Sequence, residues 1–415
     1  MEKNDKIIFR LIKWFYPGMR VKRWVGLLAF AVALVALSSA RFFIEKSFFY
    51  RALYILVTLL GVFLGVLGLR NILSSFINVF LPGGDRELVD MIYRKRYLEK
   101  GPRIVTVGGG TGLSVLLQGL KEYTSNIAAV VTVADDGGSS GRIRQQFDIL
   151  PPGDIRNCLV ALADAPTLMQ ELFQFRFDSA SELSGHSFGN LFITVMTKLT
   201  GDFEKAVKES SKVLAIRGQV IPSTLNKISL VAKYKDGSVQ EGETAIANKK
   251  RRISNIYLNP PDVQGTPDAI KAISEAQAII LGPGSLYTSV IPNLLIKEIR
   301  EAILASSALK IYISNVMTQP GETDGYSAYE HIKAITEHSS PRIIDYCVVN
   351  SRFIPSELRE KYQQDNSFPV LVDLDKIRHA GYRVIEGDLI STLDYVRHDS
   401  GKLAKIVMDL IQENF

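Results

Sequence analysis

The chain has 415 residues, of which 47% are hydrophobic, and a net charge of +6 from 49 Lys and Arg against 43 Asp and Glu. This length is enough for more than one domain with a full hydrophobic core. The two cysteines, Cys158 and Cys347, make no disulfide framework, and no histidine lies at zinc-ligand spacing to either. A reducing compartment is therefore expected.

The positive charge gathers near the N-terminus. Residues 1–23 carry seven Lys and Arg against two acids, and residues 41–51 carry three against one. The rest of the chain is close to neutral. The basic balance therefore gives no support to nucleic-acid binding, which we do not expect.

The first 102 residues predict a membrane anchor. Residues 1–23 form a basic juxtamembrane segment in which the amphipathic stretch 7–16 would lie at a membrane surface. Residues 24–70 hold two uncharged runs, Trp24–Ala40 and Ala52–Leu69, each approaching the length that spans a ~30 Å hydrocarbon core. They predict a transmembrane helical hairpin with a loop at Arg41–Arg51, and residues 71–102 predict a linker helix.

Lys and Arg are more frequent on both flanks of the hairpin than in its loop, which places both ends in the cytoplasm. We thus predict a protein of the cell membrane with two membrane-spanning helices and its remaining domain in the cytoplasm. Two alternatives stay open. Ser38-x-Ala40 is compatible with a signal-peptidase site, and both runs are compatible with buried helices of a soluble domain.

The segment from Arg103 to Arg156 carries the main functional signal. A β-branched run, Ile104–Val107, leads into Gly108-Gly109-Gly110-Thr111-Gly112 and then into an apolar helical pattern, as in a strand, phosphate turn and helix. On its own, a glycine run of this kind is equally compatible with a simple tight turn. Here, however, a second buried strand, Ile127–Val133, ends in paired aspartates and a glycine/serine loop, which favours a nucleotide or phosphorylated-metabolite site. Leu113 occupies the position of the third glycine of a dinucleotide fingerprint, which argues against NAD.

Two more polar segments begin predicted helices. Asp154 is expected to cap the helix 155–163, while Arg156 and Asn157 present a cation and an amide to a phosphate, and the two interpretations are compatible. His186 and Ser187 open a later helix and have no nearby acid for a catalytic triad, so we expect them to contact a base or ribose.

The second half of the chain repeats the pattern of buried strands with polar ends. Residues 219–258 alternate and turn as a small β insertion, whose basic run 249–252 forms a solvated loop or steers an anionic ligand. Strands are predicted at 278–281, 311–314 and 343–349. Tyr287, in the turn after the first of these, is placed to stack on a base or ring. In the C-terminal extension 351–415, Asp373, Asp375 and His379 are interpreted as caps or surface residues.

The predicted fold is therefore α/β, with a Rossmann-like and mostly parallel sheet over residues 103–350, a small β insertion, and the two-helix hairpin before it. Loops at the carboxyl ends of the strands should converge on one crevice. The candidate ligand-binding residues are Gly108, Gly109, Gly110, Thr111, Gly112, Asp135, Asp136, Gly137, Gly138, Ser139, Ser140, Asp154, Arg156, Asn157, His186, Ser187, Asn190, Gly282, Gly284, Ser285, Tyr287, Thr288 and Asn315.

Six ordered segments carry a resemblance to a known family. They are VGGGTGLSVLLQGLK, VTVADDGGSSGRIR, PPGDIRNCLVALAD, SGHSFGNLFI, LGPGSLYTSVIPNLL and SNVMTQPGETDGYSAYEHI. The chain from about Arg103 to Asn350, and more loosely to its end, resembles the gluconeogenesis factor (YvcK-type) branch of the CofD-like family that includes 2-phospho-L-lactate transferase. Many soluble members of that branch begin near the equivalent of Arg103, so the hairpin is a departure.

The resemblance implies a UDP-sugar ligand, such as UDP-N-acetylglucosamine, and a role in cell shape and envelope synthesis during gluconeogenic growth. It favours a non-catalytic regulator with envelope-synthesis partners, expected to form a homo-oligomer. Residues 108–112 would face the diphosphate, Asp135 and Asp136 would hold hydroxyls or a magnesium ion, and Tyr287 and Asn190 would position the organic ends. The alternative is a metal-dependent transferase of a phospholactyl-type group from a nucleotide-activated donor, with no covalent catalytic residue.

Overall fold

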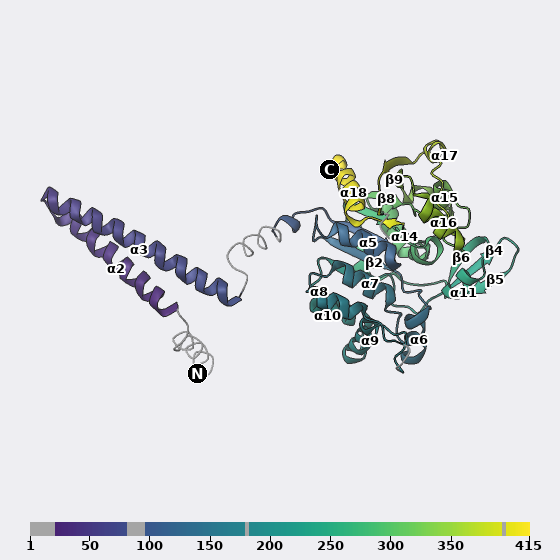
Figure 1. Ribbon diagram of the computed structural model, residues 1–415, viewed down its shortest axis with the longest axis horizontal. Helices are drawn as coiled ribbons and strands as arrows, with labels where there is room; N and C mark the ends of the chain where they lie inside the picture. Colours follow the sequence, from purple (N-terminus) through teal and green to yellow (C-terminus); the bar gives the residue numbers. More distant parts are fainter. Residues whose placement is uncertain (1–20, 81–95, 179–181, 392–395) are drawn as a thin grey trace. The chain divides into compact units, whose positions relative to one another are not determined.

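The computed structural model describes residues 21–80, 96–178, 182–391 and 396–415. The chain divides into two units, Met1–Arg96 and Tyr97–Phe415, which we describe separately. In the first unit, helix α2 (Val21–Ile44) and helix α3 (Phe48–Phe80) pack side by side as a hairpin (Figure 1). The predicted hairpin is therefore confirmed. Residues 71–80, expected to belong to the linker, instead continue α3. The amphipathic stretch 7–16 and residues 81–95 of the expected linker helix lie outside the described residues.

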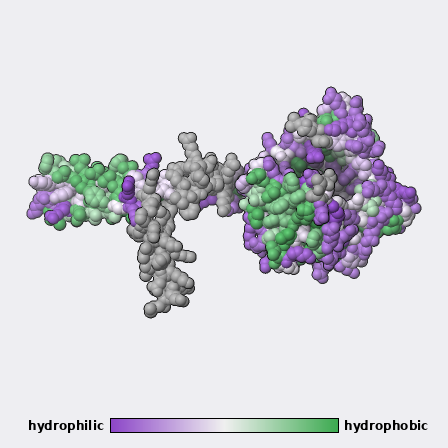
Figure 2. All heavy atoms as spheres, turned by 60° about the horizontal axis from the view of Figure 1, so that its bottom comes forward, coloured by the Kyte–Doolittle hydropathy of each residue, from purple (hydrophilic) through white to green (hydrophobic). Residues whose placement is uncertain are grey.

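The helices of the hairpin are longer than the uncharged runs, and this corrects the predicted loop. Residues 45–47 alone join α2 to α3, because Arg41 and Arg51 continue the helices through their backbone hydrogen bonds to Glu45 and Ser47. The two helices meet through small residues, and Ser38 Oγ lies 2.8 Å from Thr58 Oγ1. Their outer surface is hydrophobic (Figure 2), and both are long and apolar enough to cross a membrane.

The second unit is built on a parallel sheet. Seven strands among its described residues are ordered β10-β9-β8-β7-β1-β2-β3, and every neighbouring pair is parallel. They are β1 (Ile104–Gly108), β2 (Ile127–Val131), β3 (Gln219–Pro222), β7 (Ala278–Leu281), β8 (Leu309–Ile313), β9 (Tyr346–Asn350) and β10 (Arg383–Gly387). The central strands are almost wholly buried, which explains why they appear in the sequence as continuous apolar runs instead of alternating ones.

The chain reverses direction across the sheet at β1. From β1 it proceeds through β2 to the edge strand β3, then returns to β7 on the other side of β1 and continues to β10. Crossovers between parallel strands are right-handed, so helices that follow β1 and helices that follow β7 cover opposite faces. The loops after β1 and β7 therefore lie at the reversal point of the sheet, at the carboxyl edge where open α/β sheets bind their ligands.

Helices cover the sheet and fix these loops. Helix α5 packs against α7 and α18, and α12 packs against α14. The helices before β7 are α5 (Gly110–Leu120), α6 (Gly138–Phe147), α7 (Gly153–Leu162), α8 (Thr167–Gln174), α9 (Phe188–Thr200), α10 (Phe203–Val213), α11 (Glu243–Asn248) and α12 (Pro267–Ser274). After β7 follow α13 (Ile291–Leu295), α14 (Lys297–Ala305), α15 (Ala328–Glu337), α16 (Ser356–Gln364), α17 (Leu374–His379) and α18 (Ser400–Asn414).

The β insertion is smaller than predicted. Residues 219–222 form β3, which pairs with β2 and belongs to the main sheet. The insertion proper consists of α11 and an antiparallel sheet of β4 (Ser229–Tyr234), β5 (Val239–Glu241) and β6 (Ile253–Asn259). A four-residue apolar strand does not reveal from its own sequence which sheet it joins. Two cations of the basic run make ion pairs: Arg251 pairs with Asp236 inside the insertion, and Arg252 pairs with Glu330 of α15.

The C-terminal extension completes the same domain. Strand β10 pairs with β9 at one end of the sheet, and β11 (Ile390–Ser391) pairs with β12 (Arg397–His398) as a two-residue ladder. Helix α18 then packs along α5. The extension therefore returns the chain to the helix that follows the glycine turn.

Candidate functional site

The glycine turn between β1 and α5 lies at the reversal point of the sheet. Gly110 has φ +69°, a conformation that favours glycine. At Gly112, a Cβ atom would lie 2.7 Å from the carbonyl oxygen of Pro283, in the loop after β7. The two loops therefore approach each other so closely that only a glycine fits between them. This contact brings the predicted phosphate turn and the predicted Gly282–Thr288 turn together.

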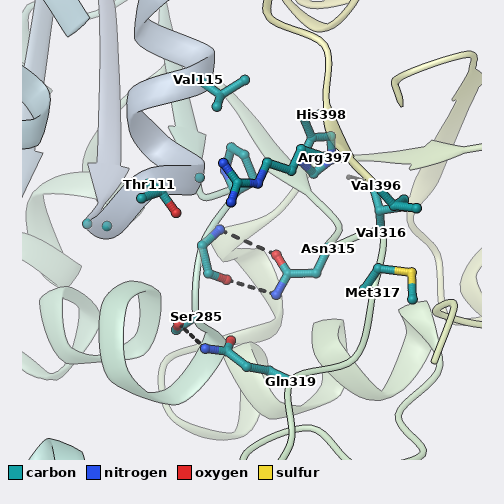
Figure 3. Close-up of a pocket in the computed structure, with 15 residues that line it drawn as sticks. Thr111, Val115, Ser285, Asn315, Val316, Met317, Gln319, Val396, Arg397 and His398 are labelled. Atoms are coloured by element: carbon teal, nitrogen blue, oxygen red, sulfur yellow. Dashed lines mark hydrogen bonds between the residues drawn. The ribbon is translucent and has the colours of Figure 1, made fainter. Parts of the chain in front are cut away.

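A cavity of about 230 Å³ opens beside this contact. Its lining residues are Gly109, Gly110, Thr111, Gly112, Val115, Pro283, Gly284, Ser285, Asn315, Val316, Met317, Gln319, Val396, Arg397 and His398. The Asn315 side chain accepts a hydrogen bond from the Gly284 N–H and donates to the Gly284 carbonyl, and Gln319 donates to Ser285 Oγ at 2.6 Å (Figure 3). Loops after β1, β7 and β8 thus share one wall of amides and hydroxyls.

The first turn of α5 contributes donors to this cavity. The N–H groups of Thr111 and Gly112 belong to a helix start without a side-chain cap, so a bound anion can accept their hydrogen bonds. The partial positive charge of the helix N-terminus adds to this preference. The cavity therefore suits a phosphate or diphosphate group.

The C-terminal extension supplies the cation of the cavity, which sequence reasoning missed. Arg397 extends from β12 into the cavity, toward Thr111 at the start of α5 (Figure 3). Its neighbour His398 keeps some exposed surface, but burial of the ring lowers its pKa to about 4, so the imidazole is neutral at neutral pH. The sequence around Arg397 shows only a basic pair before the capped helix α18. Such pairs are common on protein surfaces, so this one does not indicate a binding residue.

Acidic side chains lie on the other side of the glycine turn. Asp154 accepts a hydrogen bond from the Gly110 N–H and does not cap its own helix, because α7 begins one residue earlier at Gly153. The cap prediction was therefore wrong. Asp135 and Ser140 both contact Gly153, where a Cβ atom would lie 2.7 Å from Asp135 Oδ2. Burial, together with the charge of Asp135, raises the pKa of Asp154 to about 7.

Asp136, which was predicted as a ligand residue, has a structural role in the insertion. Its carboxylate accepts hydrogen bonds from the N–H groups of Glu243 and Thr244 at 2.8 and 2.9 Å, and from Thr244 Oγ1 at 2.8 Å. These are the first residues of α11, so Asp136 caps the helix of the insertion from a distant point in the sequence. With both carboxylate oxygens engaged, it is a poor metal ligand.

Two further acids join this side and were not predicted. Burial and the charge of Asp135 raise the pKa of Glu243, at the start of α11, to about 9. Glu322, which is 3% exposed, accepts hydrogen bonds from the Tyr287 N–H and Thr288 Oγ1, and burial raises its pKa to about 7. We call Asp135, Asp154, Glu243 and Glu322 the acid cluster. A lone Glu in an insertion or loop gives no sequence signal of such convergence.

Tyr287 does not offer a face for stacking. Its side chain is 2% exposed, and its hydroxyl lies 2.9 Å from the hydroxyl of Tyr326. A π-helical turn, Leu286–Val290, directs the ring into the core, where it packs edge-on against Tyr326 and His338. Thr288 is likewise buried, and its hydroxyl donates a hydrogen bond to Glu322. The sequence pattern placed both residues correctly at the end of β7 but not the direction of their side chains.

The predicted residues after β2 form a separate polar group. Ser139 Oγ lies 3.0 Å from His186 Nδ1 and accepts a hydrogen bond from Asn190 Nδ2, while Ser187 caps α9 by accepting from the Asn190 N–H. Arg156 donates to Asn157 Oδ1 at 2.6 Å. None of these residues lines the cavity around Gly112. The remaining predicted glycines lie at the ends of secondary-structure elements. Gly108 is the last residue of β1, Gly282 directly follows β7, Gly137 is the N-cap of α6 and Gly138 is its first residue.

The acid cluster is not a preformed metal centre. Among the described residues, no three His, Cys, Asp or Glu side chains lie close enough together to hold a metal ion. Asp135 and Asp154 nevertheless present hard oxygen atoms beside the glycine turn. Magnesium is commonly bound by one or two carboxylates, with phosphate oxygens of the substrate completing its shell. These two residues fit such a site, and Asp136 does not.

Comparisons with known proteins show the family to which this architecture belongs. The sequence model of the family described as 2-phospho-L-lactate transferase CofD matches residues 104–390. A putative gluconeogenesis factor from Clostridium acetobutylicum is 44% identical over 97% of this chain and 92% of its own length. The gluconeogenesis factor of Bacillus subtilis is 48% identical over 75% of this chain and 99% of its own length. A crystal structure of a UPF0052-family protein from Bacillus halodurans has a TM-score of 0.72 and 45% identity, covering 75% of this chain and 99% of that chain.

The parallel sheet, the glycine turn at its reversal point and the family match define a protein of the CofD fold and family. Within that family, the chain belongs to the gluconeogenesis factors, to which it is similar over nearly the whole length of its relatives. The share covered by the Bacillus relatives is about that of the second unit. The Clostridium relative covers nearly the entire chain, so its similarity extends into the N-terminal unit as well.

Proposed function

We propose that the cavity beside Gly112 binds a UDP-sugar such as UDP-N-acetylglucosamine, and that the protein acts as a membrane-tethered regulator. The observation that carries this proposal is the convergence of three strand-end loops and Arg397 on one cavity. The amides of Thr111 and Gly112 and the Arg397 guanidinium suit the two charges of a diphosphate. Hydrogen bonds between these cationic or dipolar donors and an anion are among the stronger ones in proteins.

The gluconeogenesis-factor family supports the physiological part of the proposal. The protein would bind an envelope precursor and support cell shape and envelope synthesis when cells grow on gluconeogenic carbon sources. The hairpin of α2 and α3 would hold the domain at the cytoplasmic side of the membrane, where partner proteins of envelope synthesis work. Both helices have the length and apolar composition that a membrane span requires.

Calorimetric titration tests the binding. Residues 97–415 are a suitable sample, because a crystallised relative without the hairpin portion matches 75% of this chain over 99% of its own length. We expect saturable 1:1 binding of UDP-N-acetylglucosamine, weaker binding of UMP, which lacks the diphosphate, and no binding of N-acetylglucosamine alone. Equal binding of UMP and the UDP-sugar would contradict a diphosphate site.

A second candidate function is a metal-dependent group transfer from a nucleotide-activated donor, as the family description implies. The observation in its favour is the pair Asp135 and Asp154 beside the glycine turn, which fits a magnesium ion shared with the ligand's phosphates. A bound magnesium ion would offset the charge of a departing nucleotide. The chain's own residues would hold the diphosphate in the cavity. The acceptor's hydroxyl would be the nucleophile and the nucleotide the leaving group, so no nucleophilic side chain is required.

Product formation separates the two functions. With a guanosine-nucleotide donor of a phospholactyl group, a deazaflavin acceptor and magnesium, a transferase gives a phosphodiester product that disappears in the Asp135→Asn variant. A regulator binds its UDP-sugar under the same conditions and gives no product. The gluconeogenesis-factor relationship leads us to expect binding without turnover.

A further inference from the structure

The residues that bring a cation to the cavity come from a very short strand. Strand β12 contains Arg397 and His398 alone, and it pairs with Ser391 and Ile390 of β11. A ladder of two residues supplies few hydrogen bonds and defines its register weakly. On its C-terminal side, Asp399 caps α18 by accepting a hydrogen bond from the Lys402 N–H. Something else must fix the N-terminal side of β12.

The hydroxyl of Tyr362 provides that fixation. Tyr362 lies on α16, and its hydroxyl donates to the Val396 carbonyl at 3.3 Å and accepts from the Val396 N–H at 3.1 Å. One side chain therefore satisfies both main-chain polar groups of the residue before Arg397. Val396 is 5% exposed, so without this hydroxyl its N–H and carbonyl would be buried without these partners, which costs free energy.

A small hydrophobic cluster surrounds this contact. Val396 packs with Val316, Ile354 and Ile390, and the ring of Tyr362 packs against the same group. Because Val316 and Val396 also line the cavity, this cluster forms the support behind one cavity wall. The ring of Tyr362 contributes to the packing, while its hydroxyl contributes the directional hydrogen bonds. The two contributions can be separated by changing the hydroxyl alone.

We propose that Tyr362 is a positioning residue of the ligand site, whose hydroxyl fixes Val396 and thereby holds Arg397 and His398 at the cavity wall. The inference rests on the proposed function in one respect, namely that the cavity binds the diphosphate of a nucleotide-sugar. A guanidinium that is held in place loses little conformational freedom when it binds an anion. Once β12 is released, Arg397 has to be ordered again at each binding event.

The first test compares Tyr362→Phe with Tyr346→Phe in the full chain in detergent micelles. Tyr346 is a matched control, since its hydroxyl also makes two hydrogen bonds. It donates to Asn414 Oδ1 and accepts from Arg383 Nη1. Tyr346 is the first residue of β9, so it lies at the amino edge of the sheet and not at the carboxyl edge that holds the cavity. We expect Tyr362→Phe to accelerate amide hydrogen exchange at residues 396–399 about tenfold without ligand, and Tyr346→Phe to leave it unchanged. Equal exchange in both variants overturns the inference.

The second test measures UDP-N-acetylglucosamine affinity by calorimetry. Tyr362→Phe should weaken binding about five- to tenfold, and the same change in an Arg397→Gln background should weaken it less than twofold, because the positioned group is gone. Equal losses in both backgrounds, or faster exchange with unchanged affinity, overturn the positioning role. If the unmodified protein does not bind the UDP-sugar, the proposed function fails, and the exchange measurement alone then decides whether Tyr362 holds β12.

Discussion

The two sides of the glycine turn have opposite chemistry, although only a few residues separate them. On the cavity side, Thr111 and Gly112 present uncapped N–H groups and Arg397 adds a positive charge. On the other side lies the acid cluster, in which burial raises the pKa values of Asp154, Glu243 and Glu322. The turn therefore stands between a group of donors that suits an anion and a group of carboxyl oxygens that suits hydroxyls or a cation.

This difference defines the orientation that a bound nucleotide-sugar would take in the site. Asp154 already accepts a hydrogen bond from the Gly110 N–H, so a phosphate must approach the helix start at Thr111 and Gly112. Carboxyl groups accept hydrogen bonds from hydroxyls and hold hydrated cations, so the acid cluster suits the hydroxyl-bearing part of a ligand or a magnesium ion. The largest expected effects come from changing the charge on either side.

The first prediction concerns the pH dependence of stability. The pKa of Asp154 is about 7 in the fold against 3.8 for an exposed aspartate, so the folded protein holds this proton more tightly than the unfolded chain. Stability should therefore fall as pH rises from about 4 to 7 and level off above it. At 1.36 kcal/mol per pKa unit, the loss from Asp154 is at most about 4 kcal/mol, an upper limit because the residue keeps some exposed surface.

Denaturant unfolding of residues 97–415 between pH 5 and pH 8, without divalent cations, measures this effect. The Asp154→Asn variant should show a clearly flatter profile and greater stability than the unmodified protein at pH 8. Asp148→Asn is the matched control, because the side chain of Asp148 is 85% exposed. Identical profiles for Asp154→Asn and the unmodified protein would show that Asp154 is already ionised in the fold.

The second prediction concerns the cavity side. Arg397→Gln removes the charge and leaves a shorter polar side chain, so UDP-N-acetylglucosamine should bind about 10- to 100-fold more weakly, as expected for a lost charge-assisted hydrogen bond. Arg378→Gln serves as the control, since Arg378 lies on α17, pairs with Glu386 of β10 and does not line the cavity. Calorimetry at two salt concentrations gives the result. Equal affinities for the two variants would remove Arg397 from the site.

The sequence predicted the sheet and its functional edge well, for a physical reason. Buried parallel strands appear as short apolar runs, and glycine turns follow them because loops must pass close to each other at the carboxyl edge. Gly112 shows this directly, since its contact with Pro283 excludes any side chain. Local patterns of this kind depend on neighbouring residues, so they can be interpreted before the fold is known.

The residues that complete the site could not be predicted in this way. Arg397, Glu243 and Glu322 come from three separate segments, and each is ordinary in its own sequence context. Their roles arise from where β12, α11 and the loop after β8 return to the glycine turn. Tyr287 shows the converse case, because its place after β7 was correct while a π-helical turn directed its ring into the core. Side-chain direction in such turns depends on tertiary packing.

The third and smallest predicted effect separates structural from ligand-binding acids. Asp136→Ala removes the acceptor for the first N–H groups of α11, and the loss of a helix cap typically costs about 1 kcal/mol. The free energy of unfolding should fall by roughly that amount, while magnesium affinity, measured by calorimetry with the UDP-sugar present, should stay within about twofold. The matched variant Asp135→Ala should instead weaken magnesium binding strongly. A strong loss of magnesium in Asp136→Ala would return Asp136 to the metal site, because a residue that acts only as a remote cap affects α11 and not the glycine turn.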